Sequence, residues 1–302
     1  MANLILFPGQ GAQYGTMAAD LYENNEKARK LLDEIFEQVD FDLKTIMFSE
    51  EDSRLNETEY TQPALFAHSL AVLSATGIKG DYLLGHSLGE LPALVHAGVL
   101  SLEDGIKAVV KRGELMSHAD SGGMAAIIGM NKEDLEALCE DLSDDEAKVT
   151  PANINAPDQI VVSGDKGKVD EFVSLAKERG ARRAIPLKVS GAFHSYLMED
   201  AKQAFRKFLD QIKFNDAKIP VIQNVSAKAE TEKDTLKENL IEQITSPVRF
   251  VECIEEARSL LVNESIEVGP KKVQSGLVRK ISKEISTRNI DTYEQVEEFL
   301  NE

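Results

Sequence analysis

Short runs of apolar residues alternate with longer segments of helical spacing along this chain. Residues 4–7 and 82–84 are two of the apolar runs, and glycine follows each closely, as expected of buried strands. The longer segments place apolar residues three and four positions apart, which predicts amphipathic helices. Strands and helices in alternation predict an α/β fold with a mostly parallel sheet. Helices are expected over 18–39, 63–76, 102–118, 198–212, 235–244, 251–262 and 273–282, with later strands at 220–224 and 265–268.

The middle of the chain has a different order of elements. Between Gly122 and about Ser190 the pattern predicts strand 124–130, helix 132–142, strands 149–155 and 159–164, helix 169–179 and strand 182–189. This is the ferredoxin-like order. We therefore expect a small ferredoxin-like domain, residues 122–190, inserted into a larger domain made of residues 1–121 and 191–302. Ser121-Gly122-Gly123 marks its N-terminal boundary.

The most informative motif joins a strand to a helix. Gly85-His86-Ser87-Leu88-Gly89 follows the apolar run 82–84 and precedes a helical segment. In this context G-x-S-x-G predicts a nucleophile elbow, because the glycines permit a sharp turn that exposes the serine Oγ. The helix N-terminus beside Ser87 would stabilise a developing oxyanion. The alternative is a glycine-rich turn with an incidental serine.

Composition limits the classes of function. With 42% hydrophobic and 28% charged residues among 302, the chain has the make-up of a soluble globular protein. No apolar run approaches the roughly 20 residues of a membrane span, and without a basic leader we expect no signal peptide. The net charge of −18 argues against nucleic acid as a partner. Cys139 and Cys253 lie outside any metal-ligand spacing, which favours buried thiols, a reducing cytoplasm and no metal site.

A nucleophilic serine needs a base within hydrogen-bond reach. His194 follows the last strand of the expected insertion, where the chain re-enters the larger domain, and is the best candidate. His86 adjoins Ser87, so at an elbow it points elsewhere. His68 and His96 lie in helical, alanine-rich surroundings that favour packing. His118 lies near a helix end that favours a capping or surface role.

Six motifs follow one another along the chain: Phe7-Pro8-Gly9-Gln10-Gly11-Ala12-Gln13, Gly85-His86-Ser87-Leu88-Gly89-Glu90, Asn153-Ile154-Asn155-Ala156-Pro157, Gly191-Ala192-Phe193-His194-Ser195, Gln243-Ile244-Thr245-Ser246-Pro247-Val248 and Glu267-Val268-Gly269-Pro270. Together they resemble the acyltransferase family of fatty-acid and polyketide synthesis, over essentially the whole chain. The resemblance implies an α/β-hydrolase-like large domain with a parallel sheet and an inserted ferredoxin-like small domain. It also implies an enzyme without a cofactor that moves a malonyl group from malonyl-CoA to the phosphopantetheine thiol of acyl carrier protein. The mechanism would be ping-pong, in fatty-acid biosynthesis.

The resemblance also implies catalytic roles. Ser87 would be acylated, and His194 would be the general base and acid. Gln243 matches the position whose main-chain carbonyl orients this histidine, which would explain why no aspartate partner is evident. Backbone N–H groups of Leu88 and Gln10 would hold the oxyanion, although Gly9 and Gly11 alone would justify a structural turn around Gln10.

Two further positions match the family's substrate contacts. Arg112 would receive the substrate carboxylate, because a guanidinium can grip it with two parallel hydrogen bonds; a solvated helix arginine is the alternative. Phe193 resembles the malonyl-preferring version of its motif, because a bulky ring leaves little room for an α-methyl branch; a core phenylalanine is the alternative. Leu91 and Tyr196 depart from the family pattern, and we expect them to alter the pocket rim or the carrier-docking surface.

The expected carrier protein is acidic, as is this chain, so docking requires a local basic patch. The candidates, each of which has a solvated surface position as its alternative, are Lys271, Lys272, Arg279, Lys280, Arg182 and Lys188. We expect a monomer, because nothing in the sequence demands symmetry. Three other functions stay open: an acyltransferase that serves a polyketide synthase, an α/β-hydrolase such as a thioesterase, and a non-enzymatic scaffold that holds carrier proteins.

Overall fold

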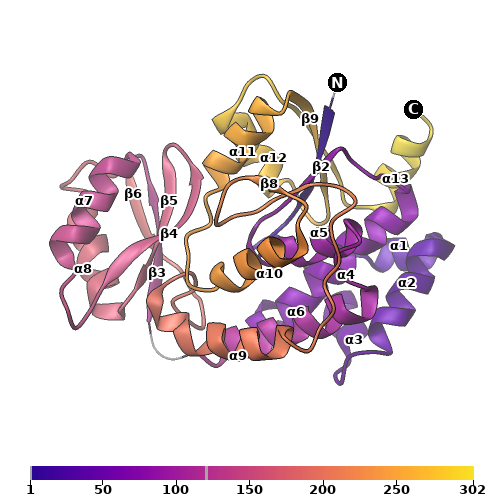
Figure 1. Cartoon of the computed structure of the whole chain (residues 1–302), viewed down its shortest axis with the longest axis horizontal. Helices are drawn as coiled ribbons and strands as arrows, with labels where there is room; N and C mark the ends of the chain where they lie inside the picture. Colours follow the sequence, from indigo (N-terminus) through magenta and orange to yellow (C-terminus); the bar gives the residue numbers. More distant parts are fainter. Residues whose placement is uncertain (1, 120–121) are drawn as a thin grey trace.

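The computed structural model describes residues 2–119 and 122–302, and strands and helices alternate along it as expected (Figure 1). The strands are β1 (Ala2–Phe7), β2 (Tyr82–Gly85), β3 (Gly123–Ile128), β4 (Val149–Ala156), β5 (Gln159–Gly164), β6 (Arg183–Pro186), β7 (Val221–Ile222), β8 (Ala229–Glu230), β9 (Val262–Val268) and β10 (Ser286–Ile290). The α-helices are α1 (Ala19–Asn24), α2 (Glu26–Phe36), α3 (Leu43–Phe48), α4 (Thr58–Thr76), α5 (Glu90–His96), α6 (Leu102–Ser117), α7 (Lys132–Leu142), α8 (Lys166–Ala176), α9 (Glu199–Leu209), α10 (Lys233–Glu242), α11 (Phe250–Ser259), α12 (Val273–Ile281) and α13 (Tyr293–Leu300). Short 3₁₀ turns are η1 (Ser53–Asn56), η2 (Ser87–Gly89) and η3 (Tyr196–Met198).

The larger sheet is mostly parallel, as the alternation predicts. Its strand order is β10-β9-β1-β2-β7-β8, and only β8 runs antiparallel to its neighbour. The two central strands carry continuous apolar runs because both faces of the sheet are covered. Leu4 and Leu6 of β1 pack with α11 and α12, whereas Ile5 and Phe7 join the core formed with α4, α5 and α6.

The smaller sheet confirms the ferredoxin-like order of elements. It is antiparallel with strand order β4-β5-β3-β6, and its helices α7 and α8 pack on it through a separate apolar core. This unit lies at the left of Figure 1. The expected boundary residue Ser121 lies outside the described residues.

A short parallel bridge between two of the family-like motifs joins the small sheet to the segment between α10 and α11. Asn153 of β4 pairs with Val248. The Ile154 N–H donates to the Val248 carbonyl at 2.9 Å, and the Val248 N–H donates to the Ala152 carbonyl at 2.8 Å. The bridge fixes the edge of the small sheet against the segment that follows α10.

Several expected helices have different bounds, and three of them show the local reason. Residues 18–39 form two helices, because Asn25 is extended and its side chain caps α2 by accepting from the Ala28 N–H. The helix expected at 63–76 begins at Thr58 and carries Pro63 inside it. The helix expected at 251–262 ends at Ser259, since Val262 already belongs to β9.

Several short elements escaped prediction. They include α3, which Asp42 caps, and the edge strand β10, which buries only Ile290 fully. Helix α13 begins in a capping box formed by Thr292 and Gln295. No helix in the described ranges is long and apolar enough to span a membrane.

Candidate active site

Ser87 occupies a sharp turn between β2 and α5, and its φ is 53°. The flanking glycines are required by close approach. A Cβ on Gly85 would lie 1.9 Å from the Gly89 carbonyl carbon, and one on Gly89 would lie 2.3 Å from the Phe7 carbonyl oxygen. Because no side chain fits at either position, the sequence motif forms the nucleophile elbow that it predicts.

His194 is the base candidate that the fold brings to Ser87. Its Nε2 lies 2.9 Å from the Ser87 Oγ, and its Nδ1 lies 2.8 Å from the Gln243 carbonyl oxygen. Because a carbonyl can only accept, Nδ1 carries the proton and Nε2 presents its lone pair to the serine hydroxyl. A main-chain carbonyl thus occupies the place that a carboxylate holds in a Ser-His-Asp triad.

The surroundings of His194 keep its imidazole neutral. Burial, followed by the nearby charge of Arg112, lowers the pKa of His194 to about 3, against which the hydrogen bond to the Gln243 carbonyl acts. A neutral imidazole can accept the proton of a serine hydroxyl.

Arg112 projects from α6 into the same site and is almost completely buried. Its Nη1 donates to Gln62 Oε1 at 2.7 Å and its Nη2 to Gln243 Oε1 at 2.8 Å, which fixes the guanidinium plane. Nη2 also reaches the Ser87 Oγ at 3.1 Å. Burial lowers the pKa of Arg112 to about 10, so it stays charged at neutral pH. The solvated-helix interpretation is therefore wrong for this side chain.

Asn224, which the sequence did not single out, fastens the elbow from the turn that follows the neighbouring strand β7. Its Oδ1 accepts from the Ser87 N–H at 2.7 Å and its Nδ2 donates to the Gly85 carbonyl at 2.7 Å. The Gln243 side chain adds a contact from its Nε2 to the Ser87 carbonyl at 3.1 Å. Asn224 ends the predicted strand 220–224 beside β2, so a polar residue at the carboxyl edge of the sheet was the available signal.

Glu90 lies directly behind this arrangement and is completely buried. Its Oε1 accepts from the Asn224 N–H at 2.5 Å, and its Oε2 has no hydrogen-bond partner among the described residues. Burial raises the pKa of Glu90 to about 8, although the charge of Arg112 acts in the opposite direction. Gln62 is a second buried polar residue missed from sequence, since it lies just outside the helix expected at 63–76.

The two expected oxyanion donors lie at the same cavity. Leu88 is the second residue of η2, so its N–H is one of the N-terminal amides without an intrahelical partner. Gln10 lies in the turn after β1, and its side chain donates to Thr58 Oγ1 at 3.1 Å. The turn packs closely against the elbow at Gly9, where a Cβ would lie 2.8 Å from the His86 carbonyl oxygen.

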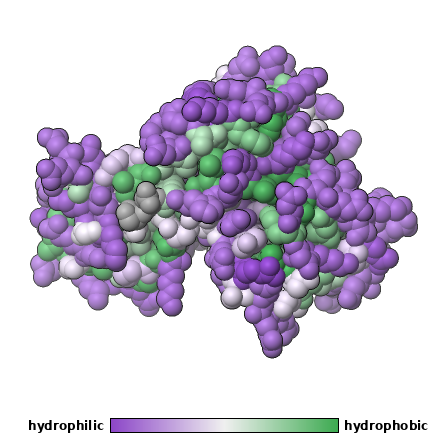
Figure 2. All heavy atoms as spheres, turned by 90° about the horizontal axis from the view of Figure 1, so that it is seen from below, coloured by the Kyte–Doolittle hydropathy of each residue, from purple (hydrophilic) through white to green (hydrophobic). Residues whose placement is uncertain are grey.

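A cavity of about 520 Å³ opens above Ser87. Gln10, Leu88, Arg112, Phe193 and His194 line it together with Ser87, while Met116, Met124, Leu187 and Val189 supply apolar wall. Seen from below, hydrophilic residues cover most of the surface, and a notch separates the part with the small sheet from the rest (Figure 2). The cavity takes its walls from both parts of the chain.

The other histidines and the cysteines match the expectations from sequence. His86 turns to Asn155 Oδ1, 2.7 Å from its Nε2, and His118 lies at the C-terminal cap of α6 with its Nδ1 2.8 Å from the Glu114 carbonyl. Fully buried His68 contacts Asp291, and half-buried His96 contacts the Lys79 carbonyl. Both cysteines are buried free thiols. No group of three His, Cys, Asp or Glu side chains in the described part of the chain is arranged to hold a metal ion.

The two departures from the family pattern differ in position. Leu91 is fully buried in the main core and is not among the residues that line the cavity. Tyr196 is 41% exposed, and its hydroxyl donates to Asp165.

The expected basic residues are dispersed. Among them, Lys188 lines the cavity, and Lys271 donates to the Gln13 carbonyl at 2.9 Å, beside the cavity wall. Arg182 and Lys280 both approach Asp158. The carboxylate of Asp158 therefore partly compensates the positive charges of Arg182 and Lys280.

Acyl transfer through a covalent serine ester is the chemistry that this geometry suits. The chain belongs to the acyl transferase domain family, which it matches over residues 5–296. It is 46% identical to the malonyl CoA-acyl carrier protein transacylase of Staphylococcus aureus (strain MRSA252) over 296 residues, which cover 97% of this chain and 96% of that protein. The Bacillus subtilis (strain 168) transacylase of the same name is 45% identical over 298 residues, with 97% and 94% covered.

Solved structures give the same relationship. An acyl carrier protein S-malonyltransferase from Vibrio cholerae superposes with a TM-score of 0.94 at 38% identity, with 99% of both chains covered. A malonyl-transacylase in complex with its type II polyketide synthase acyl carrier protein gives a TM-score of 0.95 at 32% identity, with 100% of this chain and 99% of that chain covered. The α/β fold with a parallel sheet and a ferredoxin-like small sheet is therefore confirmed.

Proposed function

We propose that this enzyme transfers the malonyl group from malonyl-CoA to the phosphopantetheine thiol of acyl carrier protein, through a malonyl ester on Ser87. One observation carries the proposal: the Ser87 Oγ lies 2.9 Å from the base His194 and 3.1 Å from the guanidinium of Arg112. A nucleophile, its base and a receptor for a carboxylate thus meet at one oxygen. The names of the relatives support the same reaction.

In the first half-reaction, Ser87 Oγ attacks the thioester carbonyl and His194 Nε2 takes the hydroxyl proton. The backbone N–H groups of Leu88 and Gln10 hold the oxyanion of the tetrahedral intermediate. When the intermediate collapses, the C–S bond breaks and the imidazolium returns its proton to the sulfur of coenzyme A. The Gln243 carbonyl stabilises the imidazolium while it exists.

In the second half-reaction, the carrier's thiol gives its proton to His194 and attacks the serine ester. The C–O bond to Ser87 breaks, and the proton passes to Oγ. Arg112 holds the malonyl carboxylate in place of its contact with Ser87, so the waiting ester is kept in a fixed pose. The substrates and these side chains supply every reacting group, so no cofactor is required.

A thioesterase and a scaffold explain the site less well. A hydrolase has no need of a buried cation whose amide partners fix it beside the nucleophile, and a scaffold has no need of an oriented neutral histidine. Service to a polyketide synthase remains a second candidate for the pathway, because one structural relative was solved with a type II polyketide carrier. We assign the reaction to fatty-acid biosynthesis.

Further assignments belong to the same proposal. Residues 122–190 form a domain inserted between the two parts of the larger domain, residues 1–121 and 191–302. Phe193, at the cavity wall, disfavours acyl groups that are branched at the α carbon. Lys188 and Lys271 are the basic residues best placed to meet an acidic carrier. We assign the enzyme to the cytoplasm as a monomer; the buried free thiols fit a reducing compartment.

The test uses malonyl-CoA and carrier protein with and without its phosphopantetheine arm. Mass spectrometry should show malonyl on the arm-bearing carrier in the presence of enzyme, and none on the carrier without the arm. Release of free malonate with an unmodified arm would instead indicate a hydrolase. Absence of both products would support the scaffold.

A further inference from the structure

Two helices outside the cavity carry the segments that hold the catalytic histidine and its orienting carbonyl. His194 lies ahead of η3, which leads directly into α9, and Gln243 directly follows the last residue of α10. We propose that the ion pairs between α9 and α10, centred on Glu242, position the Gln243 carbonyl against His194. The inference rests on the proposed role of His194 as the base.

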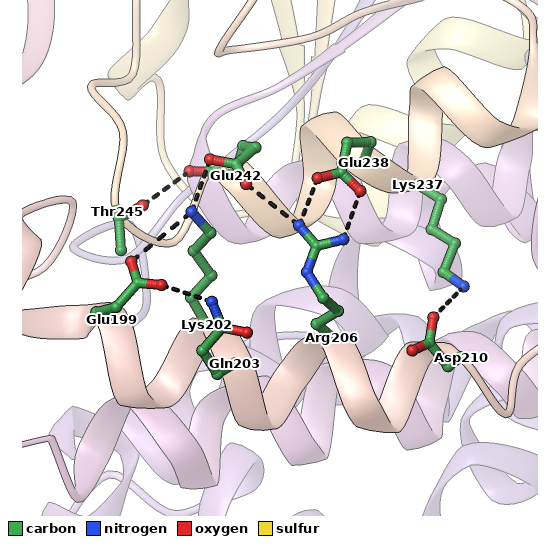
Figure 3. Close-up of polar contacts among 9 residues, drawn as sticks. All are labelled: Glu199, Lys202, Gln203, Arg206, Asp210, Lys237, Glu238, Glu242 and Thr245. Carbon is green, nitrogen blue, oxygen red and sulfur yellow. Dashed lines mark hydrogen bonds and ion pairs between the residues drawn. The ribbon is translucent and has the colours of Figure 1, made fainter.

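The ion pairs run along the contact between the two helices (Figure 3). At the end near the active site, Glu242 accepts from Lys202 Nζ at 2.7 Å and from Arg206 Nη2 at 3.2 Å. Arg206 also grips both carboxylate oxygens of Glu238, one turn earlier on α10. Lys237 and Asp210 form a separate pair at the far end, at 2.8 Å.

Glu242 is the member of this set best placed to act on the site. Two cations from α9 converge on it, and the side chain of Lys202 is only 12% exposed. Both cations also lie near the C-terminus of α10, where the helix dipole favours positive charge. Because Gln243 is the next residue, a shift of Glu242 moves the carbonyl that faces His194.

The orienting group makes the site sensitive to this contact. A carboxylate side chain can follow an imidazole by rotating about its own bonds, whereas a main-chain carbonyl moves only with its backbone. His194 in turn has a φ of 59°, a conformation that persists only where the surroundings impose it. The side chains of Glu242 and Arg206 are 35% and 31% exposed, and ion pairs that solvent reaches contribute little to global stability. The effect of these pairs is therefore expected in the geometry of the site.

The test compares Glu242→Gln with Asp210→Asn, which removes the pair at the far end of the same two helices. We expect Glu242→Gln to slow acylation of Ser87 by malonyl-CoA about fivefold with KM unchanged. Displacement of a catalytic group by about 1 Å can lower the rate of a reaction by up to about 100-fold. Asp210→Asn should acylate at the wild-type rate, and Tm should be alike in both variants. The NMR signal of the His194 Nδ1 proton should move upfield in Glu242→Gln alone, as its hydrogen bond lengthens.

Lys202→Met and the double variant Lys202→Met/Glu242→Gln supply an independent measurement. If the pair acts as a unit, the double variant is no slower than Glu242→Gln. Equal loss in Glu242→Gln and Asp210→Asn, or a wild-type rate and an unmoved proton signal in Glu242→Gln, would overturn the inference. Failure of the wild-type enzyme to acylate would overturn the proposed function instead, and the proton signal would still test the position of the carbonyl.

Discussion

The side chains of Ser87 and His194 meet at 2.9 Å although both residues hold a left-handed backbone, with φ values of 53° and 59°. Neither is glycine, so each conformation costs roughly 1–3 kcal/mol. The surrounding hydrogen bonds offset that cost. Asn224 and Gln243 hold the serine turn, and the Gln243 carbonyl holds the histidine ring. The two atoms that we propose to react are therefore in place before substrate arrives.

Asn224→Ala should slow the acylation of Ser87 and destabilise the fold. It leaves the Ser87 N–H and the Gly85 carbonyl without their partner and removes a longer contact, at 3.3 Å, from Gln243 Nε2. Loss of the two shorter hydrogen bonds alone should lower the free energy of unfolding by about 2–4 kcal/mol. Urea denaturation measures the stability, and single-turnover acylation with malonyl-CoA measures the rate.

Asn239→Ala is the matched control, because its amide donates to Gln223 Oε1 at 2.8 Å without touching the elbow. It should lose stability without loss of acylation rate. Equal slowing in both variants would mean that Asn224 acts only on overall stability.

Arg112→Ala should impair transfer of malonyl far more than transfer of acetyl. The guanidinium can make two charge-assisted hydrogen bonds to the malonyl carboxylate, at about 1.5–3 kcal/mol each, so kcat/KM for malonyl-CoA should fall at least about 100-fold. Acetyl has no carboxylate to lose. Steady-state kinetics with both thioesters measure the ratio, and an equal loss for both would remove the proposed role of Arg112.

The rate of Ser87 acylation should not fall between pH 8 and about pH 5 through protonation of the base. Burial lowers the pKa of His194 from its ordinary 6.5 to about 3, so the imidazole remains neutral over that range. Stopped-flow measurement of the acylation rate at a series of pH values tests this. A decline with its midpoint near 6.5 would show an exposed, ordinary imidazole.

Glu90 should make the protein less stable as pH rises. Burial raises the pKa of Glu90 from 4.5 to about 8, so above pH 4.5 the unfolded chain loses this proton while the folded chain keeps it. The folded state therefore binds more protons between these values, and stability falls with rising pH.

Glu90→Gln removes that titration and keeps an oxygen to accept from the Asn224 N–H. The free energy of unfolding of the wild type, minus that of Glu90→Gln, should fall between pH 5 and pH 8. Urea denaturation at the two pH values measures this difference. A constant difference would show that the carboxyl titrates alike in both states.

A feature of the site could be predicted from sequence when the residues that determine it lie close together in the chain. The elbow is a five-residue pattern whose glycines are required by contacts within the turn and with Phe7. His194 and Arg112 were identified as single residues. The orientation of their side chains could not be predicted. Arg112, for example, is held by Gln62 and Gln243, which lie 50 and 131 positions away in the chain.

The same reasoning accounts for the errors in the fold. The apolar runs of the central strands and the ferredoxin-like order were predicted because burial on both faces leaves a strong pattern. The helix break at Asn25 was missed because the apolar spacing continues on both sides of this residue. Asn25 ends one helix by capping the next. Edge strand β10 has little buried surface and so carries little pattern.

Intact-mass spectrometry after incubation with malonyl-CoA tests the proposed reaction most directly. The wild-type protein should gain one malonyl group on the peptide that contains Ser87 and lose it when carrier protein with its phosphopantetheine arm is added. Ser87→Ala should gain none. An equal adduct in Ser87→Ala, or transfer to the carrier by that variant at the wild-type rate, would contradict a malonyl-serine intermediate.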